Sequence, residues 1–229
     1  MILSLDTSTT VCSVALHTLD GGLLGCYELY TERTASSRLT LLIQDVVAHA
    51  GYTLADISAI AVAKGPGSYT GLRIGVSTAK GLCFALDKPL IGINTLAAMT
   101  EQIRAFYDPE MLFCPMIDAR RMEVYCAVYQ QDGGEKNPTK AVVLDETSFV
   151  DILDDNCVVF FGDGSDKARA VLTHPNVLFP TTQVRPSART VGALAVRAYA
   201  AGQFDDLVTF EPYYLKEFMT TKPRQQVNV

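Results

Sequence analysis

The sequence of 229 residues is poor in the residues that commonly hold metals or form cross-links. Its three histidines, His17, His49 and His174, are far apart and form neither an HExxH nor an HxxxH spacing, which argues against a metallopeptidase. Its six cysteines occur singly and without a CxxC pair, so we expect buried, reduced thiols rather than disulfides or zinc ligands. The sequence therefore contains no motif for a metal centre.

Long apolar runs and an excess of basic residues are absent too. The longest strongly apolar runs, such as residues 57–63, are too short to cross the hydrocarbon core of a bilayer, and the N-terminus has no basic start. With 19 basic and 25 acidic residues, the net charge of −6 argues against a broad basic surface for nucleic acid. We expect a cytoplasmic protein without membrane contact, to which any RNA would come through a partner.

The rest of the composition is typical of a folded globular protein. Hydrophobic residues make up 48% of the chain and charged residues 19%, which excludes an intrinsically disordered chain. The length suits one large domain or two small packed halves, and either can bury a sizeable core.

The most informative pattern is an internal duplication. When the chain is aligned with itself at an offset of 112 positions, Asp6 falls on Asp118, and the DGG turn at residues 20–22 falls on the DGG turn at residues 132–134. In each half an aspartate ends an apolar strand, and a second strand and a hairpin turn follow. A chance match is the alternative, since the identities are few, but the matched residues occupy matched places in the strand pattern.

The repeat continues through a helix, a buried strand and a glycine turn. Residues 36–50 have apolar residues at the helical period, and a shorter helix is expected near residues 147–153. A strand then runs into Gly-x-Gly in each half, at residues 65–67 and 162–164. We predict an α/β fold in which each half is a mixed sheet with helices on its faces. The halves are residues 1–107 and 108–229, with the last helix or the tail as a candidate to pack back on the first half.

A two-fold repeat with an aspartate after the first strand resembles the superfamily of actin, sugar kinases and Hsp70, in which nucleotide binds between the halves. More specific are KGPGSYTGLRIGVSTAKGL at residues 64–82, ILSLDTST at 2–9, DARRMEVY at 118–125 and PYYLK at 212–216. Together these segments resemble the TsaB family of bacterial tRNA threonylcarbamoyladenosine biosynthesis proteins over essentially the whole chain. The resemblance implies two tandem actin-like, RNase H-like halves, each with a five-stranded mixed sheet.

The resemblance also implies a partner role. In that family a larger paralogue, TsaD, transfers the threonylcarbamoyl group to the adenosine beside the anticodon of tRNA, and TsaB is the non-catalytic subunit that TsaD needs. An ATPase, TsaE, joins them, and TsaB forms a homodimer when TsaD is missing. ATP is then used by the complex and is not hydrolysed by this chain, which holds no cofactor or metal. The alternative is a free-standing enzyme of the same fold, either a small kinase or a glycoprotease-type metallopeptidase.

The places of the paralogue's metal ligands argue against catalysis by this chain. The resemblance puts the paralogue's two histidines, four residues apart, directly after a strand that matches residues 89–94 here. Thr95 and Met99 occupy those two places. A threonine hydroxyl and a thioether are poor ligands for a hard cation. Ser68 lacks the GxSxG elbow of a serine hydrolase and is expected to cap the following helix.

Nucleotide binding is left open by two candidate phosphate loops. The superfamily usually has glycine two residues after the aspartate, where backbone amides approach phosphate. This chain has the bulkier Ser8 in the first half and Arg120 in the second at that place. Both Gly-x-Gly turns can also be tight strand-to-helix turns without a ligand. Weak nucleotide binding, or binding shared with a partner, is predicted for Asp6, Thr7, Ser8, Arg120, Gly162 and Gly164.

A docking face is predicted on the first two helices of the first half. Small residues at positions 71, 75 and 79 form a stripe that would let another helix approach closely. Spacing alone favours a stripe that faces the protein's own sheet, whereas the resemblance favours docking, because the first two helices of TsaB proteins pack against a partner. The wide apolar stripe of the preceding helix indicates burial on two sides. The predicted interface residues are Leu39, Leu42, Ile43, Val46, Gly71, Gly75 and Ala79.

Overall fold

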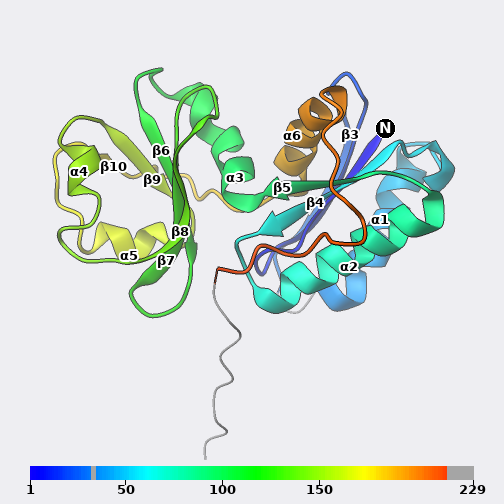
Figure 1. The fold of residues 1–229 in the computed structure, drawn as a ribbon, viewed down its shortest axis with the longest axis horizontal. Coiled ribbons are helices and arrows are strands. Elements are labelled where there is room, and N and C mark those ends of the chain that lie inside the picture. The colour runs from blue at the N-terminus through cyan, green and yellow to red at the C-terminus, as the bar shows by residue number, and fades with distance from the viewer. Residues whose placement is uncertain (32–34, 216–229) are drawn as a thin grey trace, which may run out of the picture.

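The computed structural model describes residues 1–31 and 35–215, and each of its two halves contains one five-stranded sheet (Figure 1). The strand order in the first sheet is β3-β2-β1-β4-β5. β1 pairs antiparallel with β2 and parallel with β4, so the sheet is mixed. Its strands are β1 (Ile2–Asp6), β2 (Cys12–His17), β3 (Leu23–Leu29), β4 (Ala59–Gly65) and β5 (Leu90–Asn94).

The second sheet repeats this arrangement. Its strand order is β10-β9-β6-β7-β8, and β6 pairs antiparallel with β7 and parallel with β9. Counted from the first strand of each half, both sheets have the order 3-2-1-4-5, which confirms the predicted α/β class with two tandem mixed sheets. The strands are β6 (Leu112–Asp118), β7 (Glu123–Tyr129), β8 (Glu135–Val143), β9 (Val158–Phe161) and β10 (Val177–Leu178).

Helices follow the strands at the places that the repeat predicts. The longest of them is preceded by Ser68, whose hydroxyl accepts a hydrogen bond from the N–H of Gly71 and caps the helix as expected. Asn94 caps the next helix by accepting hydrogen bonds from the N–H groups of Leu96 and Ala97. The α-helices are α1 (Ala35–His49), α2 (Tyr69–Leu86), α3 (Thr95–Ile103), α4 (Val150–Leu153), α5 (Ser165–Arg169) and α6 (Ala188–Ala200), and short 3-10 helices cover Leu54–Asp56 and Arg104–Phe106.

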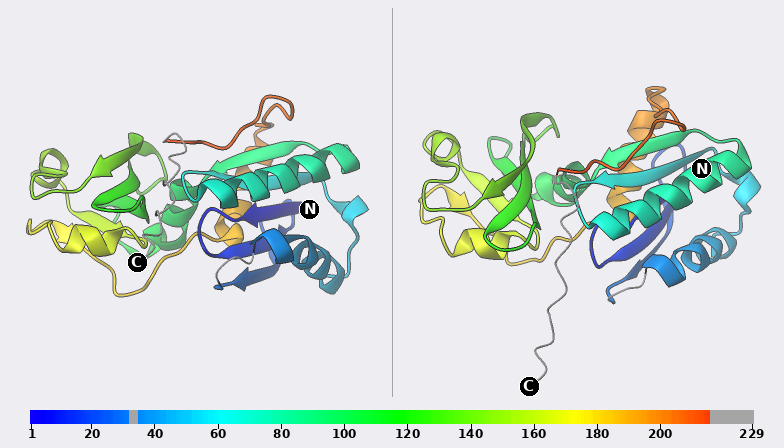
Figure 2. Two further views of the ribbon diagram at one scale, coloured as in Figure 1. Left: turned by 90° about the horizontal axis from the view of Figure 1, so that it is seen from below. Right: turned by 60° about the horizontal axis from the view of Figure 1, so that its bottom comes forward.

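The two faces of the first sheet are covered by different helices (Figures 1 and 2). α1 and α2 lie on one face, in an apolar cluster that includes Leu3 and Leu5. α6 covers the opposite face, where Ile2 and Ala61 form a cluster with Val191. Because successive residues of a strand point to opposite faces, a sheet covered on both sides buries every residue of its central strands. This explains why the central strands have nearly continuous apolar sequences.

α3 and α6 connect the two halves. α3 follows β5 of the first sheet, but its Leu96 and Met99 are buried in a cluster with the second sheet. α6 follows β10 of the second sheet and packs across β1, β2 and β4 of the first sheet. A division of the chain at residue 107 therefore separates the two sheets but not the helices that cover them.

After α6 the chain returns along the β5 edge of the first sheet (Figure 1). The Asp205 N–H donates to the carbonyl of Leu90 at 2.9 Å, and the Asp205 carboxylate accepts a hydrogen bond from the Gly92 N–H at 2.7 Å. Phe210 is inserted into the core of the first half. The segment thus covers a strand edge that would otherwise be exposed. The polar tail predicted at residues 216–229 lies outside the described residues.

The thiols are free, as the sequence predicts, and four of the six are buried while Cys26 and Cys157 are partly exposed. All six cysteines lie in the described part of the chain and are free, and Cys12, Cys83, Cys114 and Cys126 are buried. Burial raises the pKa of the Cys12 thiol to about 11, which makes it unreactive at neutral pH. Separately, no helix formed by the described residues is both long enough and apolar enough to span a bilayer.

Candidate functional site

The first candidate phosphate loop follows β1, and its residues are buried. Asp6, Thr7 and Ser8 are each no more than 1% exposed. One carboxylate oxygen of Asp6 accepts hydrogen bonds from the Ser8 amide at 2.9 Å and the Ser8 hydroxyl at 2.7 Å, while the other oxygen has no hydrogen-bond partner among the described residues. Burial raises the pKa of Asp6 to about 6, although the hydrogen bonds from Ser8 oppose the shift.

The glycine turn before α2 covers this loop. The Ser68 N–H donates to the Ser8 carbonyl at 2.6 Å, and the Thr7 hydroxyl donates to the Gly71 carbonyl at 2.7 Å. A Cβ at Gly67 would come closer than 3.0 Å to the Ser8 carbonyl oxygen, so glycine is required by the approach of two backbones. These contacts bury the first candidate phosphate loop beneath the protein's own chain.

The second glycine turn is packed in the same way. The Gly164 N–H donates to the Met116 carbonyl at 3.1 Å, and a Cβ at Gly162 would come closer than 3.0 Å to the same carbonyl oxygen. The Asp118 N–H donates to the Asp163 carboxylate at 2.9 Å. Contacts with β6, with Met99 of α3 and with Val124 of β7 therefore account for both glycines, and the plain strand-to-helix turn is the interpretation that fits them.

Arg120 lies at the exposed tip of the β6–β7 hairpin. Its φ of 70° is in the left-handed region, and its N–H donates to the Asp118 carboxylate at 2.5 Å. Asp118 also forms an ion pair with Lys167 at 2.6 Å. The residues predicted to bind nucleotide thus lie in three turns, one in the first half and two in the second, and the turn in the first half is closed.

Metal ligands are not gathered anywhere in the described ranges 1–31 and 35–215, where no group of three His, Cys, Asp or Glu side chains could hold an ion. Thr95 and Met99, at the places of the paralogue's expected ligands, are fully buried in the protein core. The three histidines lie on β2, at the end of α1 and beyond α5: His17, His49 and His174.

The stripe of small residues on α2 faces the protein's own sheet. A Cβ at Gly75 would come closer than 3.0 Å to the Thr7 hydroxyl oxygen and would lie 3.6 Å from a methyl group of Val62. A Cβ at Gly71 would collide with the Thr7 carbonyl, and Ala79 is completely buried. These three residues are therefore not a partner-facing surface. Their small size lets α2 approach β1 and β4 closely.

The predicted interface residues of α1 are absorbed in the same core. Leu39, Ile43 and Val46 are 2–3% exposed and belong to the apolar cluster beneath α1 and α2. Leu42 is half-buried and packs against that cluster. The apolar stripe of α1 is thus buried by the first sheet and by α2, which contacts α1. In this structure none of the seven predicted interface residues forms a fully exposed docking surface.

The exposed sides of α1 and α2 carry other apolar residues, which the sequence reasoning missed. Leu41 is 45% exposed, and Phe84 is 83% exposed near the end of α2. Phe84 lies out of phase with the small-residue stripe, since it follows Ala79 by five positions rather than four. A large aromatic residue out of phase with the buried stripe is the signal that could have revealed this outer surface.

The chain matches the family model described as TsaD, tRNA N6-adenosine threonylcarbamoyltransferase, over residues 22–171. It is 40% identical to the tRNA threonylcarbamoyladenosine biosynthesis protein TsaB of Escherichia coli (strain K12) over 131 residues, which are 57% of this chain and 55% of that protein. It is 37% identical to the TsaB protein of Bacillus subtilis (strain 168) over 133 residues, 58% of this chain and 56% of that protein. The chain thus spans about half the length of the curated relatives it matches.

A solved structure gives a longer match. The fold is similar to that of YeaZ from Pseudomonas aeruginosa with a TM-score of 0.78 and 30% sequence identity, over 93% of this chain and 99% of that chain. The activator of the 2-hydroxyisocaproyl-CoA dehydratase from Clostridium difficile, solved with bound ADPNP, has a TM-score of 0.50 at 11% identity, which is a likeness of fold alone.

Proposed function

Since the chain belongs to the family of TsaD, the tRNA N6-adenosine threonylcarbamoyltransferase, and of the TsaB proteins, we propose that it serves threonylcarbamoyladenosine formation in tRNA as a non-catalytic subunit. The modified position in this proposal is the adenosine beside the anticodon. A TsaD-like paralogue performs the transfer, and this chain supports it by forming a complex.

The observation that carries the non-catalytic role is the closure of the first loop. A catalytic centre needs reacting groups that substrate can reach. The carboxylate of Asp6 is buried beneath the start of α2, and Thr95 and Met99 are packed in the core at the places expected for metal ligands. The chain therefore supplies no cofactor or metal in this proposal, and the ATP used in the reaction is consumed by the other subunits.

The outer side of α1 and α2 is the surface that we assign to the partner. The two helices contact each other on one face of the first sheet, and Leu41 and Phe84 leave apolar area in water there. Exposed apolar side chains on neighbouring helices suit a helical partner that covers them. That partner is a TsaD-like paralogue, or a second copy of this chain when the paralogue is absent. A TsaE-like ATPase and tRNA join through the complex.

Reconstitution tests the proposal. TsaD, TsaE, the enzyme that supplies threonylcarbamoyl-adenylate, tRNA and ATP are combined with and without this chain, and threonylcarbamoyladenosine is measured in the digested tRNA. We expect the modified nucleoside only in the reaction with the chain. Equal yields in both reactions would contradict the proposal.

The purified chain alone supplies the matching control for catalysis. We expect it to hydrolyse neither ATP nor peptides, since the first loop, which holds the Asp6 carboxylate, is closed. Repeated turnover of ATP by the isolated chain would contradict the non-catalytic role and would favour a free-standing kinase-like enzyme of the same fold.

A further inference from the structure

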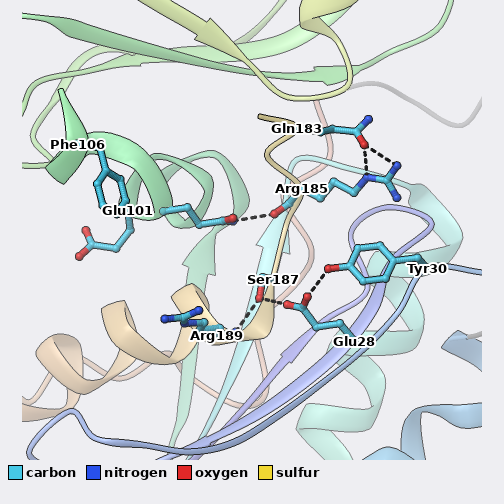
Figure 3. Close-up of a pocket in the computed structure, with 9 residues that line it drawn as sticks. Glu28, Tyr30, Glu101, Phe106, Gln183, Arg185, Ser187 and Arg189 are labelled. Carbon is cyan, nitrogen blue, oxygen red and sulfur yellow. Dashed lines mark hydrogen bonds between the residues drawn. The ribbon is translucent and has the colours of Figure 1, made fainter. Parts of the chain in front are cut away.

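A cavity of about 520 Å³ lies where the segment before α6 passes the end of β3 and the end of α3 (Figure 3). Its volume falls within the range of small-molecule binding sites. None of the described residues that line it belongs to either glycine turn or to the Asp6 loop. The cavity is therefore separate from the places where the sequence predicts nucleotide binding.

Two carboxylates in the cavity wall already accept hydrogen bonds from other side chains of the protein. Glu28 accepts hydrogen bonds from two side-chain hydroxyls, and Glu101 accepts them from two guanidinium groups. Although burial opposes ionisation, the arginines hold the pKa of Glu101 below its usual value. Glu101 therefore has little acceptor capacity left for a cationic ligand, whereas the described donors to Glu28 are all neutral. The donors are Tyr30 and Ser187 to Glu28, and Arg104 and Arg197 to Glu101.

The two arginines of the wall, in contrast, have unused donors. Gln183 accepts hydrogen bonds from Nε of Arg185 at 3.1 Å and from Nη2 at 2.8 Å, which orients the guanidinium. Those bonds use two of its five N–H donors. The same guanidinium lies 5.4 Å from the centre of the Tyr30 ring. Arg189 is exposed and forms no ion pair with any described residue. The hydrogen-bond donors of the cavity wall that remain available thus belong to the cationic side chains of Arg185 and Arg189.

An aromatic ring completes the wall. Phe106 is 83% exposed, and in Figure 3 it lies with Arg189 on the side opposite Tyr30 and the guanidinium of Arg185. An aromatic ring that stays in water at the rim of a cavity offers its face to a flat ligand, because stacking removes apolar area from water. The cavity thus combines free guanidinium donors with a free aromatic face.

We propose that this cavity binds a nucleotide, whose phosphate contacts Arg189 and whose base stacks on Phe106 on the same side of the cavity, while the guanidinium of Arg185 lines the opposite wall. A guanidinium matches the oxygens of a phosphate with paired N–H donors, which makes arginine the usual residue for this contact. The nucleotide is either free or part of an RNA strand. Binding of a free nucleotide is independent of the function proposed above, whereas binding of RNA deepens it and rests on tRNA as the substrate.

Other small ligands fit the cavity less well. Inorganic phosphate would leave the ring of Phe106 and most of the volume unused. The ammonium group of a free amino acid would need an acceptor, and both Glu28 and Glu101 are already engaged. A nucleotide would engage both the available guanidinium donors and the exposed ring of Phe106.

Calorimetric titration of the full chain with AMP, with inorganic phosphate and with a short single-stranded RNA tests the proposal. We expect binding of AMP or of the RNA, and weaker binding of phosphate alone. Arg189→Ala should weaken binding about tenfold, the usual effect of losing a charged hydrogen bond. Phe106→Ala should weaken it about fivefold or more through lost stacking.

Matched controls come from the outer helices. Phe84 is as exposed as Phe106, and Arg38 is an exposed arginine of α1, and neither lines the cavity. Phe84→Ala and Arg38→Ala should bind as the unchanged chain does. All four substitutions shorten exposed side chains, so thermal unfolding should remain unchanged and serves as the check of folding.

The outcomes distinguish a free nucleotide from a nucleotide within RNA, and they test this site separately from the proposed role in tRNA modification. Binding of AMP assigns a free-nucleotide site, whereas binding of RNA without AMP assigns a site for one nucleotide of a strand. No binding of either at about 1 mM, equal binding of phosphate and AMP, or binding that Arg189→Ala and Phe106→Ala leave unchanged would overturn the inference. None of these titrations involves TsaD, so their failure leaves the reconstitution result intact, and the reverse also holds.

Discussion

The two halves place the same aspartate in opposite environments. Asp6 and Asp118 both end the first strand of a sheet with the same strand order. Asp6 is 1% exposed, and within the described part of the chain one of its carboxylate oxygens has no hydrogen-bond partner. The side chain of Asp118 is 43% exposed and pairs with Lys167. A repeated backbone has therefore kept its topology while the chemistry at equivalent positions has diverged.

The helix that follows each glycine turn explains the difference. In the first half α2 has 18 residues and its start is hydrogen-bonded to the loop after Asp6. In the second half α5 has only five residues, and Asp118 remains at the surface. The long helix also gives the first half an exposed outer side for a partner. Closure of the loop and provision of a docking surface thus depend on the same element.

The largest effect is expected from a substitution that breaks the close contact between the glycine turn and the Asp6 loop in the first half. Gly67→Ala should lower the free energy of unfolding by more than about 3 kcal/mol, because the new Cβ meets the Ser8 carbonyl, which the hydrogen bond from Ser68 holds in place. Gly164→Ala, its counterpart, should cost less, about 1–2 kcal/mol, since its Cβ would lie 2.9 Å from a methyl group of Val124 and no closer than 3.0 Å to the backbone carbons of Ile117 and Met116. Urea unfolding measures both.

An exposed helical glycine provides the control for that pair. A Cβ at Gly81 meets no atom within 4 Å, so Gly81→Ala should raise the free energy of unfolding by about 0.5–1 kcal/mol through helix propensity. Equal losses for Gly67→Ala and Gly164→Ala would show that the two halves are packed alike, contrary to the comparison above.

The second effect concerns pH. The pKa of Asp6 is about 6 in the folded chain and 3.8 in the reference state, so the folded state holds this proton more tightly than the unfolded state. This contribution to stability is present at low pH and is lost as the pH rises from about 4 to about 6, a loss of up to about 3 kcal/mol. Asp6→Asn keeps an acceptor for Ser8 and cannot ionise, so it should remove this slope. Urea midpoints across this pH range measure it.

Asp118→Asn is the matched substitution in the other half. It removes an exposed ion pair and should change stability by no more than about 1 kcal/mol. If Asp6→Asn and the unchanged chain lose stability in parallel between pH 4 and 6, the buried carboxylate is not the cause.

The third effect tests the docking role of the first half. Phe84→Asp should weaken the complex with a TsaD-like partner about tenfold or more while the isolated chain keeps its stability, because the side chain is 83% exposed. Phe106→Asp, equally exposed near the other half, is the control. Co-elution and titration measure association. Normal association of the Phe84 variant would remove the outer side of α2 from the interface.

Gly75→Arg does not test docking, although the predicted interface includes this residue. A side chain at Gly75 would meet the Thr7 hydroxyl inside the protein, so the variant is expected to unfold the chain before any effect on a partner is seen. Leu42, which packs against the core, has the same difficulty to a lesser degree.

The smallest effect concerns the exposed half of the comparison. Lys167→Ala removes the ion pair with Asp118 and a hydrogen bond to the Glu123 carbonyl. We expect a loss of at most about 1 kcal/mol in urea unfolding, reduced further by added salt, because the pair is partly exposed. A loss that does not change with salt would contradict a solvent-screened ion pair between Lys167 and Asp118.

Much of the fold could be predicted from the sequence, but the site could not. Local patterns predict the repeated strands, the Ser68 cap and a stripe of small residues, including Gly75, that faces the protein's own sheet. They do not predict the burial of Asp6, because it depends on residues far away in the chain. The contact of the last helix with the first half is a candidate from the sequence, and the structure shows which strands α6 covers. The exposed Phe106 has no local pattern, since its position at a cavity rim arises only when α3 meets the segment before α6.

The sequence by itself determined a doubled α/β chain, its family resemblance and two glycine turns. Only the tertiary structure decided that the small residues of α2 pack on the protein's own sheet, that the first turn is closed, and that Arg185 and Arg189 line a cavity between the halves. The physical reason is that periodicity identifies which face of a helix is buried, whereas the atoms that bury it belong to distant segments. The same glycine spacing therefore fits an internal contact and a docking surface, and only the packing distinguishes them.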